Sequence, residues 1–391
     1  MSMEDYFSKP VTPSDYRHLA EKRLPRFLFD YVDGGANEET TLRANQSDFL
    51  GFSLKQRVMR DVGQVDTRTT LTGREASMPL ALAPVGLAGM MARRGEAMAA
   101  RAAAAAAIPF TTSTVGICPL EEVQAASTAP FWFQLYMLRN RDLVVALLER
   151  AQKAGCETLI FTVDLAVTGM RHRDERNGVL AGGLAGALAK AWHTLSRPHW
   201  AIDVGLKGKP HNFGNLLEVV TDPNDLNEFK AFIASQFDPT VTWKDIAWLR
   251  TLWPGKILIK GILTGEDARA AEQAGADGVI VSNHGGRQLD GVASSISRLP
   301  EVVLAVGDRI EVYMDGGVRS GVDVVKALAL GAGGVLIGRP WVWALASRGE
   351  QGLTDLLEVF RQEIAVAMAL MGVNNITEIT SDLIENQHRH Q

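Results

Sequence analysis

The chain has 391 residues, 46% of them hydrophobic and 22% charged, which is typical of a soluble globular protein that buries a large core. Its formal net charge of −5 gives no support to nucleic-acid binding. The two cysteines, Cys118 and Cys156, exclude a disulfide framework, and no Cys/His cluster has zinc spacing, so we expect a reducing cytoplasmic compartment and no metal site.

The N-terminal region predicts two short helices ahead of the main fold. Residues 1–13 are polar and predict neither a signal peptide nor a membrane span. From Ser14 to Val32, apolar residues recur at helical spacing, and Pro25 interrupts them. Gly34 and Gly35 then predict the end of the second helix. Tyr31 in that helix, taken alone, is more typical of core packing than of a binding site.

From residue 78 onward the chain alternates apolar strands with helices. The expected strands are 80–84, 108–113, 131–135, 158–163, 256–260, 278–282, 310–315 and 334–338. The expected helices are 96–107, 120–126, 141–154, 264–274 and 321–330. Successive strands that are separated by helices run parallel, so eight of them predict an α/β fold, a single (β/α)₈ TIM barrel over about 78–345.

Polar side chains stand where most of these strands end. They are Ser113, Gln134, Tyr136, Thr162, Asp164, Lys260, Ser282, His284 and Asp315. Each alone has a structural interpretation as a helix cap, a partner of the backbone or a member of a buried ion pair. Because the carboxyl ends of the strands form the catalytic face of a TIM barrel, the whole set predicts an active site there.

The sixth strand leads into Ser282-Asn-His-Gly-Gly-Arg-Gln-Leu-Asp290. An imidazole suits proton abstraction near neutral pH, and a guanidinium can hold a carboxylate through two parallel hydrogen bonds. An isolated His-x-x-Arg is more often a structural histidine beside a surface arginine. With its polar neighbours, the pair His284 and Arg287 predicts a base aimed at an anionic substrate.

The seventh and eighth strands end in Asp315-Gly-Gly-Val-Arg-Ser-Gly321 and in Gly338-Arg339-Pro340. These two loops form the common phosphate site of TIM barrels, where glycine lets backbone N–H groups approach the oxygens and arginine adds charge. Tight turns would explain the glycines without the arginines. We therefore predict a phosphorylated ligand.

Residues 171–253 are too long for an ordinary connection and form a predicted insertion after the fourth strand. The apolar, glycine-interrupted part 179–192 is too short to span a bilayer, and it is interpreted as a mobile lid, a membrane-surface segment or an inserted helix packed on the barrel. Residues 242–250 predict an amphipathic helix. Residues 353–371 predict a long helix that covers the barrel, and 387–391 a frayed tail.

Five motifs together resemble one family. They are Ser-Asn-His-Gly-Gly-Arg-Gln-Leu-Asp (282–290), Phe-Gln-Leu-Tyr (133–136), Thr-Val-Asp (162–164), Ile-Lys-Gly (259–261) and Asp-Gly-Gly-Val-Arg (315–319). The chain resembles the FMN-dependent L-2-hydroxy acid dehydrogenases and oxidases from about Tyr16 to Asp382, as a single domain over 1–391. Within that family, three further motifs at 83–87, 92–96 and 203–206 resemble the bacterial respiratory L-lactate dehydrogenases most.

The resemblance implies a role for each matching residue. The catalytic base is His284 with its carboxylate partner Asp164, the substrate carboxylate is held by Arg287 and Arg171, and the substrate tyrosines are Tyr31 and Tyr136. The implied flavin contacts are Ser113, Gln134, Thr162 and Ser282, with Lys260 at the N1–O2 edge and the backbone of Val85 and Gly86 beside N5. The implied phosphate loops contain Asp315, Gly316, Gly317, Arg319, Gly338 and Arg339.

Two positions depart from relatives within the family. Val115 stands where plant glycolate oxidases carry tryptophan, so their substrate preference does not transfer. Gly86 stands where the oxidases generally have alanine and mandelate dehydrogenases have glycine. The missing methyl group beside N5 weakens the oxidase interpretation, although turn geometry alone could require a glycine here.

The resemblance implies an enzyme that uses FMN to oxidise L-lactate, or a close L-2-hydroxy acid, to the 2-oxo acid and passes the electrons to a quinone-type acceptor. The alternatives are an L-mandelate dehydrogenase and an oxidase that uses O₂. An FMN-using isomerase would not need both Arg171 and Arg287, and a flavin-storage protein would not need His284 and Asp164. We also expect a homo-oligomer that lies peripherally on the inner face of the cytoplasmic membrane. Whether the C2 hydrogen leaves as hydride or as proton stays open.

Overall fold

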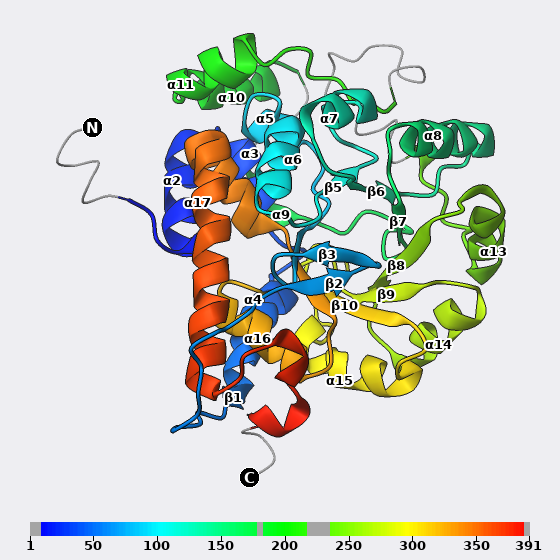
Figure 1. Cartoon of the computed structure of the whole chain (residues 1–391). Coiled ribbons are helices and arrows are strands. Elements are labelled where there is room, and N and C mark those ends of the chain that lie inside the picture. Colours follow the sequence, from blue (N-terminus) through cyan, green and yellow to red (C-terminus); the bar gives the residue numbers. More distant parts are fainter. Residues whose placement is uncertain (1–8, 178–182, 217–234, 387–391) are drawn as a thin grey trace.

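The computed structural model describes residues 9–177, 183–216 and 235–386, in which helices surround a central barrel of strands (Figure 1). The barrel strands are β4 (Leu80–Leu82), β5 (Thr111–Ser113), β6 (Trp132–Leu135), β7 (Thr158–Thr162), β8 (Lys256–Ile262), β9 (Gly278–Val281), β10 (Glu311–Asp315) and β11 (Gly334–Ile337). Neighbouring strands pair in parallel in the order β4-β11-β10-β9-β8-β7-β6-β5. A parallel bridge between Leu82 and Phe110 joins the two outermost strands. The predicted (β/α)₈ barrel is confirmed.

All eight strands differ from their predicted bounds by one to three residues, as the second and fifth strands show. The second strand was expected from residue 108, but β5 begins at Thr111, because Pro109 has no N–H to donate and Phe110 makes only an isolated bridge. β8 runs two residues beyond the expected end and is irregular between Lys260 and Ile262. The first difference lies at the amino-terminal end of β5, and the second lies at the carboxyl end of the barrel.

The interior of the barrel is filled by one buried cluster. It contains Leu71, Ala76, Ala81, Ala83, Trp132, Ile160, Leu258, Ile280, Tyr313 and Leu336. Leu71 and Ala76 come from a hairpin of β2 (Thr69–Leu71) and β3 (Arg74–Ala76), whose Thr72 N–H donates to the hydroxyl of Tyr313 at 2.9 Å. The hairpin closes the amino-terminal end of the barrel. It was not predicted, because strands of three mostly polar residues carry no clear alternation.

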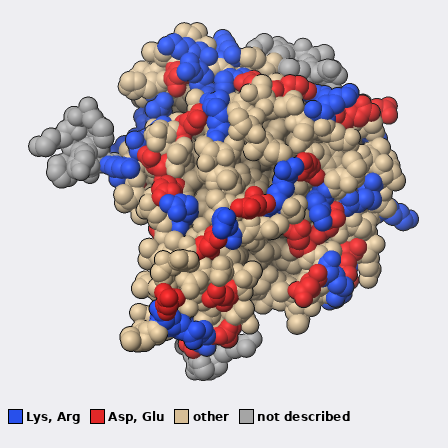
Figure 2. Space-filling view, in the orientation of Figure 1, with Lys and Arg blue, Asp and Glu red and all other residues tan. Residues whose placement is uncertain are grey.

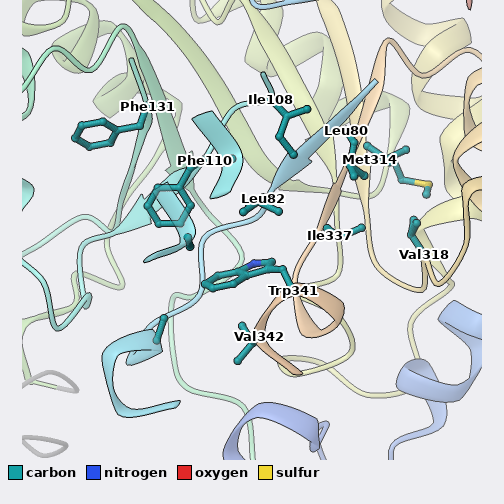
Figure 3. Close-up of a cluster of buried hydrophobic side chains, with 14 of the residues drawn as sticks. Leu80, Leu82, Ile108, Phe110, Phe131, Met314, Val318, Ile337, Trp341 and Val342 are labelled. Atoms are coloured by element: carbon teal, nitrogen blue, oxygen red, sulfur yellow. The ribbon is translucent and has the colours of Figure 1, made fainter. Parts of the chain in front are cut away.

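The helices between the strands bury their apolar faces against the outside of the barrel. They are α5 (Ala88–Met91), α6 (Gly95–Ala105), α7 (Leu120–Ala126), α8 (Arg141–Lys153), α14 (Gly265–Gln273), α15 (Ser295–Val306) and α16 (Gly321–Ala329). α17 spans Arg339–Met371 and is broken at Arg348 and Gly349, so the long helix predicted from 353 is its second part. Figure 3 shows Trp341 of α17 beside β4; its indole N–H donates to the carbonyl oxygen of Ala83 at 3.1 Å.

The terminal segments pack beside α17. α2 (Pro13–Arg23) and α3 (Arg26–Asp33) are separated at Pro25 as predicted, and α2 packs against α17. α4 (Thr40–Ser47) and η1 (Asp48–Gly51) follow. β1 (Phe52–Leu54) pairs antiparallel with β12 (Ile384–Asn386), which comes after η3 (Ile376–Glu378) and η4 (Ser381–Leu383). The predicted tail at 387–391 lies outside the described residues.

The described part of the predicted insertion contains helices. They are α9 (His172–Arg176), α10 (Gly183–Leu195), α11 (Pro198–Trp200), η2 (Ala201–Leu206) and α13 (Trp243–Leu252), the last confirming the helix expected at 242–250. The first residues of the 179–192 segment lie outside the described residues, and α10 contains the rest. Trp200 fixes this region to the barrel, because its indole N–H donates to the carbonyl oxygen of Met90 at 2.8 Å. In the described part of the chain, no helix is both long enough and apolar enough to cross a bilayer.

Candidate active site

A cavity of about 520 Å³ opens at the carboxyl ends of the barrel strands. Most of the residues predicted for the site line it: Tyr31, Val85, Gly86, Tyr136, Thr162, Arg171, Lys260, His284, Arg287, Asp315, Gly316, Gly317, Arg319, Gly338 and Arg339. Four predicted residues, Ser113, Gln134, Asp164 and Ser282, are not part of the lining. They lie behind it and contact one another or the lining residues. The barrel topology thus brings together side chains that are up to about 300 positions apart in the sequence.

The loop after β9 holds His284 in an uncommon backbone conformation. His284 has φ of 58°, which is in the left-handed region. Gly285 and Gly286, which follow it, are in the same region, with φ of 64° and 72°. The turn is fixed from both ends, since the Ser282 hydroxyl accepts from the His284 N–H at 3.1 Å and the Asn283 side chain accepts from the Gly286 N–H at 3.0 Å. These bonds direct the imidazole into the cavity.

Nδ1 of His284 lies 2.7 Å from Oδ1 of Asp164, which follows β7. The carboxylate accepts the Nδ1 hydrogen and so leaves Nε2 as the proton acceptor of a neutral imidazole. Gly261 in β8 makes room for this carboxylate, because a Cβ at Gly261 would lie 2.7 Å from the Cβ of Asp164. The pair therefore depends on three different strand ends.

The charge states of this pair follow from burial and from nearby cations. Burial disfavours the charged imidazole and, with the cations Lys260 and Arg171, lowers the pKa of His284 below its usual value despite the neighbouring Asp164. Burial also opposes ionisation of Asp164, but the contacts with His284 and Lys260 outweigh it and lower the pKa of Asp164. Near neutral pH the site holds a neutral base beside an ionised carboxylate.

Lys260 is buried at the end of β8 between two partners. Its Nζ donates to the Ser282 hydroxyl at 2.9 Å and lies 3.1 Å from Oδ2 of Asp315. Burial would lower the pKa of Lys260, but Asp315 and Asp164 outweigh burial and raise it. Lys260 therefore contributes a fixed positive charge to the floor of the cavity.

Four arginines line the cavity and give it a positive potential: Arg171, Arg287, Arg319 and Arg339. Burial, together with neighbouring charged groups, lowers the pKa of Arg287 to about 9, of Arg339 to about 9 and of Arg319 to about 10, so each is still protonated at neutral pH. Buried cations without enough carboxylates around them predict anionic ligands.

These arginines are held mainly by backbone carbonyls. Nη1 of Arg287 donates to the carbonyl oxygens of Tyr31 and Gly34 at 2.5 and 2.8 Å, and the guanidinium lies over the Tyr31 ring. Arg339, the first residue of α17, donates to the carbonyl oxygens of the last two residues of α3, of Gly34 and of Gly285. For Arg171, Nε is buried and has no hydrogen-bond partner among the described residues.

Several other buried polar atoms have no protein partner in the described part of the chain. They include Nε2 of Gln134, Oγ1 of Thr162 and Oδ1 of Asp315, all at strand ends around the cavity. Oε1 of Gln134 accepts from the Ser113 hydroxyl at 2.9 Å, which fixes the orientation of the amide. Because buried polar atoms are normally hydrogen-bonded, these atoms indicate a polar ligand in the cavity.

The aromatic and apolar walls of the cavity were predicted only in part from the sequence. The aromatic rings of Tyr136 and Phe237 lie 5.0 Å apart between centroids and are tilted by 45°, and burial raises the pKa of Tyr136 above its usual value. Apolar residues from the helices and the insertion also line the cavity, namely Leu28, Leu87, Met90, Phe213 and Val342. Apart from Leu87, which lies in the motif at 83–87, no motif contained them, since an apolar residue at helical spacing predicts burial and not what it is buried against.

Comparison with known proteins places this geometry in a family. Residues 20–386 match the FMN-dependent dehydrogenase family model. The chain is 52% identical to an L-lactate dehydrogenase of Caulobacter sp. (strain K31), covering 96% of this chain and 98% of that protein. It is 51% identical to an L-lactate dehydrogenase of Azorhizobium caulinodans, covering 95% and 97%.

Solved structures agree with the sequence comparison. The monotopic membrane protein (S)-mandelate dehydrogenase aligns with a TM-score of 0.89 and 36% identity over 97% of this chain and all of that chain. A mandelate oxidase aligns with a TM-score of 0.80 and 37% identity over 95% and 97%. The chain belongs to the FMN-dependent dehydrogenase family.

Proposed function

We propose that the protein oxidises L-lactate, or a close L-2-hydroxy acid, to the 2-oxo acid with FMN and delivers the electrons to a quinone-type acceptor. The observation that carries the proposal is the His284–Asp164 pair in the same cavity as Arg171 and Arg287. A base and two cations side by side suit a substrate that carries a hydroxyl and a carboxylate on adjacent carbons. The L-lactate dehydrogenases that are about half identical to this chain support lactate as the substrate.

The residues around the cavity fit FMN. Nε2 of Gln134, Oγ1 of Thr162 and Oδ1 of Asp315 need partners that the polar edge of a flavin and its ribityl hydroxyls would supply. Gly316 and Gly317 have φ of 93° and 87°, which leaves their N–H groups accessible to a phosphate beside Arg319 and the start of α17. Lys260 would place positive charge where the reduced flavin carries negative charge.

The oxidation removes two electrons and two hydrogens from the substrate, and bound FMN supplies the two-electron acceptor. Arg171 and Arg287 hold the carboxylate and so orient C2. The neutral imidazole of His284 accepts one proton at Nε2, and Asp164 stabilises the imidazolium that results. Tyr31 and Tyr136 line the same cavity and would contact the substrate.

L-Mandelate is the second candidate substrate. The aligned structures of mandelate enzymes support it, and Val115 leaves more room than a tryptophan would. Lactate is favoured because the identity to L-lactate dehydrogenases is about 50% and that to the mandelate enzymes is 35–38%.

We also propose a peripheral membrane contact through the α10–η2 apolar surface, which consists of Leu188, Trp192, Leu195, Ile202 and Leu206. Leu188, Trp192 and Leu195 are 61%, 73% and 75% exposed and share one face of α10 by their spacing. Lys and Arg side chains gather around α10 and α11 at the top of Figure 2, and Lys207 and Lys209 are exposed nearby. Apolar residues that insert and basic residues that attract anionic lipid headgroups favour an interfacial site.

One experiment tests the catalytic proposal. The purified yellow protein is mixed with L- and D-lactate and with L- and D-mandelate, without oxygen, and the bleaching of the flavin is followed. The reduced protein is then mixed with a soluble quinone or with air-saturated buffer. We expect reduction by L-lactate and faster reoxidation by the quinone. Reduction by mandelate alone, or faster reoxidation by oxygen, would overturn the proposal in favour of the corresponding alternative. The expected homo-oligomer and cytoplasmic location stay predictions.

A further inference from the structure

The turn after α3 lies between the two loops that carry Arg171 and Arg287. It follows Asp33, the last residue of α3, whose ionisable side chain is only 5% exposed. Arg17 donates to both carboxylate oxygens of Asp33, at 2.6 and 2.7 Å, and Nη1 of Arg173 donates to Oδ2 at 2.8 Å. Neither Asp33 nor Arg173 lines the cavity. The Asp33 carboxylate therefore acts on neighbouring arginines and not on a ligand.

Arg173 connects this carboxylate to Arg171, which stands two residues earlier at the start of α9. Nη2 of Arg173 also donates to Glu39 at 2.5 Å. In the backbone, the Asn37 N–H donates to the carbonyl oxygen of Met170 at 2.7 Å. Residues 170–173 are thus fixed to residues 33–39 at three points, two of them through the Arg173 guanidinium.

The opposite side of the same turn contacts the Arg287 loop. The Ala36 N–H donates to the carbonyl oxygen of Gly286 at 2.8 Å, and the Gly34 carbonyl accepts from Arg287. A Cβ on Gly35 would lie 2.9 Å from the Gly286 oxygen, and one on Gly34 would lie 2.7 Å from the Asp30 oxygen and 3.3 Å from Cδ of Arg173. The two glycines are needed so that the turn can touch both loops.

This arrangement opposes a repulsion inside the cavity. Arg171 and Arg287 are both cations that face one ligand, and after burial the charge of Arg171 is the largest cause of the lowered pKa of Arg287. Two like charges cannot hold each other in place, so the loops that carry them need an attractive contact behind the site. Asp33 supplies a full negative charge there, and the carbonyls at the end of α3 add partial negative charge.

We propose that Asp33 is a positioning residue that, through Arg173, fixes Arg171 at the separation from Arg287 that two-point binding of the substrate carboxylate requires. The inference rests on the proposed function, in which these two arginines hold that carboxylate. Arg17 contacts the same Asp33 carboxylate from α2 but makes no hydrogen bond with α9 in the part of the chain that the structure describes. The effect of Asp33 on substrate binding is therefore transmitted by Arg173 and not by Arg17.

The decisive comparison is between Arg173→Gln and Arg17→Gln in the FMN-loaded enzyme, with Asp33→Asn as the third variant. Each arginine variant removes one cationic partner of Asp33 and leaves the other. We expect Arg173→Gln and Asp33→Asn to raise the KM for L-lactate at least about tenfold and to lower kcat by a smaller factor, because the misplaced guanidinium weakens binding and orientation. Arg17→Gln should leave KM within about twofold, even if its melting temperature falls.

Two further measurements separate positioning from general loss of structure. Equilibrium binding of pyruvate, followed through the flavin spectrum, should weaken in parallel with KM in Arg173→Gln and not in Arg17→Gln. The double variant with Asp33→Asn and Arg173→Gln should be no worse than the worse single variant, because both remove the same contact.

Unchanged KM and pyruvate binding in a folded Arg173→Gln protein would overturn the inference. An equal rise in KM in all three variants would also overturn the inference, since it would make Asp33 a purely structural residue. Failure of the proposed function is distinguishable, because the unaltered enzyme itself would then not be reduced by any L-2-hydroxy acid in the panel.

Discussion

A Cβ built on Gly86 would lie 2.7 Å from Cγ2 of Val115 and 3.2 Å from the hydroxyl of Tyr31. Gly86 lies outside the left-handed region, so it is close packing and not positive φ that demands a glycine here. The two residues in which this chain departs from family relatives are thus in contact. Val115 fills the space that a methyl group at position 86 would need.

Gly86→Ala should therefore be destabilised by overpacking, by about 1–3 kcal/mol. Adding Val115→Ala to Gly86→Ala should recover part of this loss, because the smaller side chain makes room for the methyl group. The coupling between the two positions is measured by thermal unfolding of four FMN-loaded proteins: the wild type, both single variants and the double variant. Equal stability of Gly86→Ala and wild type would show that the loop adjusts without cost.

His284→Gln should retain FMN but lose reduction by substrate, because the imidazole takes up the proton whereas the phosphate loops retain the cofactor. Loss of general-base catalysis predicts a decrease in the reduction rate of at least about 10²-fold. Stopped-flow reduction by L-lactate measures the rate, and the flavin absorbance per protein serves as the control. A rate near that of wild type would exclude His284 as the base.

The pH dependence should show the lowered pKa of His284. Only the neutral imidazole accepts a proton, so kcat/KM should fall as pH decreases through this pKa. Because burial lowers the pKa, the midpoint should lie below the usual value of about 6.5. Asp164→Asn removes the carboxylate that raises this pKa, so its acid limb should move to still lower pH and its plateau should fall. An unshifted limb in Asp164→Asn would contradict the assignment.

Arg287→Lys should weaken substrate binding although the charge is retained, since an ammonium group cannot form two parallel bonds to a carboxylate. Losing one charge-assisted hydrogen bond, worth about 1.5–3 kcal/mol, predicts a KM at least about tenfold higher. Steady-state kinetics with L-lactate tests this. Arg309→Lys, at an exposed arginine paired with Glu272, is the matched control. Identical kinetics for Arg287→Lys and the control would show that Arg287 does not hold the carboxylate.

The α10–η2 apolar surface should control binding to lipid. A variant with Leu188→Gln, Trp192→Gln and Leu195→Gln should co-sediment less with anionic vesicles while its reduction by L-lactate stays unchanged. Leu304→Gln removes a still more exposed leucine from α15 and should bind as wild type does. If the wild-type protein does not co-sediment at all, the membrane proposal fails and the alternative of a lid is favoured.

The sequence by itself determined the barrel and most of the candidate site. Short apolar runs that end in polar residues, with helices between them, can be recognised from the sequence as successive parallel strands. The carboxyl ends of parallel strands in a barrel lie at one face. His284, Lys260 and Asp315 could therefore be assigned to one site before any distance was known. The hairpin of β2 and β3 was missed, because its three-residue strands gain their stability from the barrel end that they cover.

Only the tertiary structure decided which side chains contact one another and so affect each other's charge state or packing. That Asp164 lies on the Nδ1 side of His284, or that Gly86 excludes a methyl group because of Val115, depends on distances between segments that no local pattern encodes. The same holds for Asp33. In the sequence it is one acidic residue at a helix end, and it becomes a buried counter-charge only because α2, α9 and the end of α3 converge around it.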